Sequence, residues 1–104
     1  IGFSALKDGA FLNKVVQDLV NRSYSNWEII TEYHFGGYAK STTILNQFID
    51  NFMTLHHIPL EFVYTGKMMY GIFDLASKGY FEKGSSVLAI HTGGIRPSYT
   101  PFLD

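Results

Sequence analysis

The sequence predicts an α/β fold, in which a mostly parallel sheet carries helices on both faces and so forms three layers. Short, β-prone apolar runs alternate along the chain with segments whose apolar residues recur every three or four positions. One such run, from Val87 to Ile90, contains no polar residue. An uninterrupted apolar run of this length is typical of a parallel strand that is covered on both faces.

The first third of the chain is expected to contain two strands and one helix. Residues 1–4 read as the end of a strand, and a helix follows from Asp8 to Val20. A polar, turn-rich loop over residues 21–26 then leads to a bulky, β-prone strand over residues 27–33. The predicted helix has apolar residues at helical spacing on one face, namely Phe11, Leu12, Val15, Val16 and Leu19.

A glycine-hinged loop over residues 34–40 precedes the second predicted helix. Ser41 or Thr42 can cap this helix, which should run to about Leu55 and end before Pro59, since the residue preceding a proline avoids helical geometry. Its apolar stripe consists of Ile44, Leu45, Phe48, Ile49 and Phe52.

The last part of the chain is expected to alternate strand and helix again. Residues 60–64 predict a short strand, and residues 67–78 a helix that Gly79 ends. The strand over residues 87–90 follows. Residues 95–104 contain two prolines and no periodicity, which predicts an irregular tail.

The composition fits one soluble domain. The chain has 104 residues, of which 46% are apolar and 16% charged, and eight basic residues against nine acidic ones give a net charge of −1. This balance offers no basic face for nucleic acid. No cysteine is present, and the four histidines have no suitably spaced partners, so we predict no metal site. We find no membrane span or leader and expect a cytoplasmic protein.

Two predicted strands end in a threonine followed by glycine. Thr65-Gly66 follows the strand over residues 60–64, and Thr92-Gly93-Gly94 follows the strand over residues 87–90. Ligands bind at the carboxyl ends of parallel strands, where glycine lets a flat ring approach the backbone. We therefore expect the hydroxyls of Thr65 and Thr92 to line one shared slot, although such pairs are also ordinary turn chemistry.

Three segments, over residues 33–40, 63–69 and 87–94, resemble the pyridoxal-phosphate (PLP) enzymes of the 1-aminocyclopropane-1-carboxylate deaminase and D-cysteine desulfhydrase family. The resemblance extends from about residue 3 to residue 94. It implies a type II PLP-enzyme fold, in which residues 1–94 form the C-terminal part of the larger, cofactor-binding domain. The lysine that binds the cofactor and the phosphate-binding loop would lie in a missing N-terminal half, so the isolated chain should not be catalytically competent.

The same resemblance implies roles for individual residues. Tyr38 and Tyr64 match the two active-site tyrosines of the family, and Tyr64 is the better candidate for proton transfer or substrate positioning. Thr65, Thr92 and Gly93 resemble the residues around the pyridine end of PLP in desulfhydrases. Lys40 and Lys67 do not match the cofactor-binding lysine, and we interpret both as solvated.

Thr65 decides between the branches of the family, because the deaminase branch has glutamate at this position. A hydroxyl cannot supply a countercharge to the pyridine nitrogen, which favours β-elimination from a small amino acid such as D-cysteine over the opening of a cyclopropane ring. The complete enzyme is expected to be a homodimer. Three alternatives stay open: 1-aminocyclopropane-1-carboxylate deamination, a non-catalytic α/β binding or interaction module, and a phosphate-ligand binder.

Overall fold

The computed structural model describes residues 1–94, in which two short strands form a parallel sheet. Strand β1 (Gly2–Phe3) pairs with β2 (Ile29–Ile30), with Gly2 opposite Ile29. The backbone N–H groups of Gly2 and Ser4 donate to the carbonyls of Glu28 and Ile30, both at 2.9 Å. The strand predicted at the start of the chain is confirmed, whereas only two residues of the run over 27–33 are paired.

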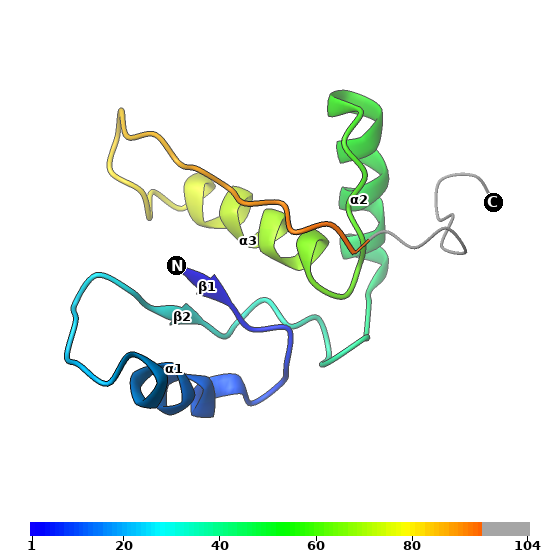
Figure 1. Ribbon diagram of the computed structural model, residues 1–104. Helices are drawn as coiled ribbons and strands as arrows, with labels where there is room; N and C mark the ends of the chain where they lie inside the picture. Colours follow the sequence, from blue (N-terminus) through cyan, green and yellow to red (C-terminus); the bar gives the residue numbers. More distant parts are fainter. Residues whose placement is uncertain (95–104) are drawn as a thin grey trace.

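Three α-helices lie within residues 1–94. A 3₁₀ turn, η1 (Gly9–Phe11), leads into α1 (Leu12–Val20), and α2 (Thr43–His56) and α3 (Thr65–Ser77) follow. All three match the helices expected from the sequence to within a few residues. In Figure 1 the strand pair lies between α1 and α3, while α2 stands beside the start of α3.

Helix α2 begins and ends as its sequence predicts. Thr42 is in extended geometry, and its side-chain oxygen accepts a hydrogen bond from the Leu45 N–H at 3.2 Å, which satisfies one of the free donors at the helix start. His57 follows the last turn in left-handed geometry, with φ of 56°. Ile44, which we placed on the apolar stripe, is instead exposed.

The core forms where α2 packs against α3 and the segment between them. Its centre consists of a few buried aliphatic and aromatic side chains. Partly buried hydrophobic side chains pack against this centre. Tyr70 of α3 makes edge-on contacts with the rings of Phe35 and Phe48, at centroid distances of 4.9 and 5.3 Å. The buried centre consists of Leu45, Ile49, Phe52 and Leu60.

Helix α3 also packs closely on the sheet, at Gly71. A Cβ atom at this position would lie 2.5 Å from the Phe3 ring and 3.1 Å from the Tyr33 ring, so no larger residue fits without a shift. Nearby, the Tyr33 hydroxyl donates to Asp74 at 2.7 Å, and Asp74 pairs with Lys78 at 2.8 Å. These contacts tie the segment after β2 to the second half of α3. Gly79, with φ of 76°, ends the helix as predicted.

Two predicted strands do not form in this chain. Residues 60–64 make a turn that leads into α3, because Glu61 folds back to hold the start of the helix. Residues 87–90 form no strand, and Leu88 is 87% exposed, since no neighbouring strand within residues 1–94 pairs with this run. The three-layer arrangement around a larger parallel sheet stays a prediction. The tail predicted over residues 95–104 lies outside the described residues.

Candidate functional site

The two tyrosines predicted to share a site are in contact. The hydroxyls of Tyr38 and Tyr64 lie 3.1 Å apart and are hydrogen-bonded, and their ring centroids are 6.0 Å apart with planes inclined at 58°. Tyr38 comes from the loop before α2, and Tyr64 occupies the N-cap position of α3. Both side chains remain about half exposed, at 55% and 53%, so a ligand can reach the phenols.

Glu61 organises the start of α3, a role that the sequence pattern did not predict. Its carboxylate accepts hydrogen bonds from the backbone N–H groups of Val63, Tyr64 and Thr65 at 2.5, 2.7 and 2.6 Å. A carboxylate in this place satisfies the unpaired donors of the helix and interacts favourably with its dipole. The signal in the sequence was an acidic residue shortly before a predicted helix start, in a segment that we assigned to a strand.

Thr65 is buried rather than open. Only 2% of the residue is exposed, and its hydroxyl oxygen accepts a hydrogen bond from the Glu61 N–H at 3.0 Å. The same oxygen lies 3.3 Å from a carboxylate oxygen of Glu61, to which the hydroxyl donates. The Thr65 hydroxyl is therefore surrounded by polar groups, and in this chain Glu61 holds it.

The segment that carries Thr92 and Gly93 runs beside Pro59 and Glu61. His91 Nε2 lies 2.8 Å from the Pro59 carbonyl, and the Gly93 N–H donates to His91 Nδ1 at 2.9 Å. These two contacts together require the imidazole tautomer with its proton on Nε2. A Cβ atom on Gly94 would lie 3.6 Å from the Glu61 side chain. The two predicted threonine-glycine segments thus meet at Glu61, and Thr92 itself is exposed.

Lys67 is buried, so its interpretation as a solvated lysine is wrong. Only 1% of the residue is exposed, and its ammonium donates to the Gly37 carbonyl at 2.9 Å. Burial lowers the pKa of Lys67 below the ordinary lysine value, and the negative charge of Glu61 opposes part of that change. Lys40, in contrast, is exposed as expected.

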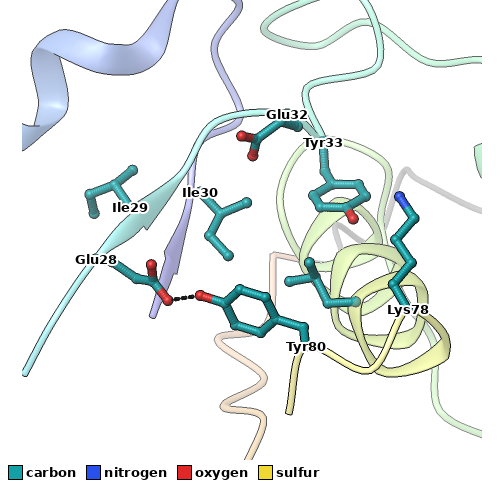
Figure 2. A pocket seen from close by; sticks show the side chains of 8 residues that line it. Glu28, Ile29, Ile30, Glu32, Tyr33, Lys78 and Tyr80 are labelled. Carbon is teal, nitrogen blue, oxygen red and sulfur yellow. Dashed lines mark hydrogen bonds between the residues drawn. The ribbon is translucent and has the colours of Figure 1, made fainter.

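A separate groove lies between β2 and the end of α3 (Figure 2). It has a volume of about 520 Å³, and none of the predicted site residues lines it. Its polar groups are already paired: the Tyr80 hydroxyl donates to Glu28, and the Tyr33 hydroxyl donates to Asp74. Burial raises the pKa of Tyr33, and the hydrogen bond to Glu28 raises that of Tyr80. Its lining residues are Glu28, Ile29, Ile30, Glu32, Tyr33, Leu75, Lys78 and Tyr80.

Two further features of the described part of the chain bear on function. Among residues 1–94, no three side chains of the types that bind metals gather at one place. None of the helices in the same range has the length and apolar character needed to cross a bilayer.

Comparison with known proteins finds relatives named 1-aminocyclopropane-1-carboxylate deaminase. The chain is 47% identical over 68 residues to a Pyrococcus horikoshii protein provisionally named 1-aminocyclopropane-1-carboxylate deaminase, and the match covers 65% of this chain. It is 38% identical over 66 residues to the 1-aminocyclopropane-1-carboxylate deaminase of Bradyrhizobium diazoefficiens, covering 64%. The enzyme of Rhizobium leguminosarum bv. viciae is 37% identical over 81 residues, or 74% of the chain.

The matched region is a small part of each relative. The chain spans about one fifth of the length of the Pyrococcus horikoshii and Bradyrhizobium diazoefficiens proteins, and 24% of the Rhizobium leguminosarum protein. No family model matches the chain. No solved structure matches it either. The chain is therefore a homologue of a segment, about one fifth in length, of proteins named 1-aminocyclopropane-1-carboxylate deaminase.

Proposed function

We propose that this chain is the C-terminal part of a PLP-dependent enzyme and contributes the pyridine side of its cofactor site. The observation that carries the proposal is the hydrogen-bonded pair of Tyr38 and Tyr64, 3.1 Å apart, in a chain homologous to part of named deaminases. The two exposed phenols come from segments 26 residues apart in the sequence. Such an arrangement fits a site in which two side chains contact a substrate from different sides.

Gly93 and Thr92 leave room for a flat cofactor ring, whereas the Thr65 hydroxyl is already hydrogen-bonded to Glu61. At Gly93 no atom beyond the glycine and its two chain neighbours lies within 4 Å of the position of a Cβ atom, and the neighbouring Thr92 is exposed, so a ring and a hydroxyl partner have room here. The Thr65 hydroxyl would have to exchange its Glu61 contact for the ring. When bound, PLP supplies the electron sink that stabilises negative charge at the α-carbon of an amino acid.

Within this site, Tyr64 would hold or move a proton at the substrate, and Tyr38 would orient the Tyr64 phenol through their hydrogen bond. Thr65, in place of glutamate, favours β-elimination. From D-cysteine, this reaction breaks the Cα–H and Cβ–S bonds and releases sulfide, and addition of water to the remaining enamine gives pyruvate and ammonia. The names of the relatives favour a second candidate, the deamination of 1-aminocyclopropane-1-carboxylate.

The exposed apolar surface of the chain supports the proposal that more protein packs on it. Phe11 of the η1 turn and Val15 and Leu19 of α1 are all exposed, with Leu19 at 79%. An amphipathic helix of a complete domain buries such a face. We propose that an N-terminal half of the enzyme, which would supply the cofactor-binding lysine, covers this face, and that the complete enzyme is a homodimer.

A chimeric enzyme tests this proposal. Residues 1–94 would replace the homologous region of the Bradyrhizobium diazoefficiens enzyme, and the absorbance of bound PLP would confirm that the site has assembled. We expect the chimera to form pyruvate from D-cysteine, and its Thr65→Glu variant to shift towards release of ammonia from 1-aminocyclopropane-1-carboxylate. A PLP-loaded chimera inactive on both substrates would support the non-catalytic alternative. Preference for the cyclopropane substrate without Thr65→Glu would support the second candidate.

A further inference from the structure

We infer that Lys67 is a positioning residue for the tyrosine pair, because its hydrogen bond to the loop before α2 holds Tyr38 against Tyr64. This inference rests on the proposed function only for the use to which the pair is put. The contacts that carry it belong to the chain itself, and they can be tested without cofactor or substrate.

The loop that carries Tyr38 is attached to α3 by a hydrogen bond from Lys67. The Lys67 ammonium donates to the carbonyl of Gly37, the residue directly before Tyr38, at 2.9 Å. The other backbone hydrogen bonds of this carbonyl and its residue are local: Lys40 N–H donates to the same carbonyl at 3.0 Å, and Gly37 N–H donates to His34 at 3.2 Å. These local bonds shape the turn but do not fix its place on the molecule. The Phe35 ring packs on Tyr70 further along α3, and Lys67 connects the turn beside Tyr38 to the first part of the helix.

Tyr64, the other tyrosine, is fixed to α3 through its backbone. Tyr64 lies three residues before Lys67, and the Glu61 carboxylate holds its backbone N–H at 2.7 Å. The Met68 N–H donates to the Tyr64 carbonyl at 3.0 Å, which fixes Tyr64 to the first turn of α3. Both tyrosines are therefore attached to the first turn of α3, Tyr64 through the backbone and Tyr38 through the hydrogen bond of Lys67 to its loop.

The burial of the charged Lys67 side chain has a cost in free energy. Only 1% of the Lys67 residue is exposed, and burial of a charged side chain is unfavourable unless the charge is paired and hydrogen-bonded. Glu61 supplies negative charge nearby, and the Gly37 carbonyl supplies the acceptor. A lysine needed only to fill space at this position could be replaced by an apolar residue, so the buried cation points to its contact with the loop.

The test uses the 104-residue chain labelled with ¹³C at the tyrosine rings and the glycine carbonyls, and with ¹⁵N at the lysine side chains. In the wild-type chain we expect nuclear Overhauser contacts between the rings of Tyr38 and Tyr64, and a through-hydrogen-bond coupling from the Lys67 nitrogen to the Gly37 carbonyl. Absence of that coupling would by itself overturn the inference. Lys67→Met keeps the apolar stem and removes the donor, and we expect it to lose the ring-to-ring contact at least five-fold.

Two controls separate positioning from loss of stability. Lys83→Met removes one charge from an exposed site and should leave the ring contact unchanged. Gly71→Ala should destabilise the chain through Phe3 while leaving the ring contact intact below its melting temperature. If Lys67→Met does not fold, Lys67→Gln, which is polar but too short to reach Gly37, is measured in its place. A folded variant of either kind that retains the contact would overturn the inference.

These measurements remain informative whatever the chimera does. An inactive chimera with a Lys67-dependent ring contact would contradict the proposed function and leave the positioning role standing. An active chimera whose ring contact survives Lys67→Met would contradict only the positioning role.

Discussion

The hydroxyl of Tyr38 is hydrogen-bonded to that of Tyr64 at 3.1 Å, although α2 lies between them in the sequence. Helix α2 leaves the loop of Tyr38 and returns, through the turn at Glu61, to the start of α3. The core formed by Leu45 and Ile49 of α2 with Leu60 holds these two points together. The geometry of the pair therefore depends on the packing of α2, and not on either loop alone.

Removal of the Glu61 carboxylate is expected to destabilise the chain. Glu61→Ala leaves three backbone N–H groups at the start of α3 without their acceptor, which should lower the free energy of unfolding by about 1–3 kcal/mol. Urea unfolding followed by circular dichroism measures this change. The exposed Glu82→Ala is the control and should change stability by less than about 0.5 kcal/mol. Equal effects of the two substitutions would show that the Glu61 carboxylate does not stabilise the start of α3.

The buried Lys67 should make stability depend on alkaline pH. Its pKa is lower in the folded chain than in the unfolded one, so between these two values the unfolded state binds more protons. The free energy of unfolding of the wild-type chain, relative to Lys67→Met, should therefore rise as pH increases from the folded pKa to the ordinary lysine value, and stay flat below that window. Urea titrations of both proteins across this range measure the difference. A difference that falls with pH would contradict the burial of the ammonium.

Asp74 should make stability depend on acidic pH. The hydrogen bond from Lys78, followed by that from Tyr33, lowers the pKa of Asp74. Its contribution to stability is fully present above the ordinary carboxyl value and is lost as pH falls through the lowered one. Asp74→Asn should therefore weaken the acid dependence of thermal unfolding. Asp18→Asn, in the exposed pair with Lys14, should change it little. An unaltered acid dependence in Asp74→Asn would count against the pairing of Asp74 with Lys78 and Tyr33.

The apolar face of α1 should drive self-association of the isolated chain. Val15 and Leu19 of α1 and Phe11 of the preceding η1 turn are exposed at intervals of four residues, and such patches on soluble proteins commonly mark contact surfaces. Leu19→Glu should reduce the association measured by sedimentation equilibrium at micromolar concentration. Asn13→Glu adds the same charge at another exposed site and should have a smaller effect. A strictly monomeric wild-type chain would contradict the proposal that further protein covers this face.

Features that depend on neighbours in sequence could be predicted. The α2 helix follows from the Thr42 cap and the spacing of Leu45, Ile49 and Phe52, all of which are local signals. The end of α3 at Gly79 follows in the same way. A shared site for Tyr38 and Tyr64 was expected only from the family resemblance, and their direct hydrogen bond was not predicted, because no local pattern specifies a contact across 26 residues of sequence.

Features that depend on distant partners were missed. An apolar run forms a strand only beside another strand, and residues 87–90 have no such neighbour within residues 1–94. Residues 60–64 also looked like a strand, but the Glu61 carboxylate satisfies the backbone donors that a strand would have paired. Lys67 was predicted to be solvated because its partner, the Gly37 carbonyl, lies 30 residues away in the sequence.

The central claim is that the tyrosine pair belongs to a PLP enzyme site, and the rate of ammonia release from D-cysteine by the PLP-loaded chimera tests it most directly. Tyr64→Phe removes only the hydroxyl. It should lower this rate by about 100-fold or more, the usual loss when a proton-transfer group is removed, while the exposed Tyr24→Phe should leave it unchanged. A Tyr64→Phe chimera that binds PLP and keeps the full rate would contradict the claim.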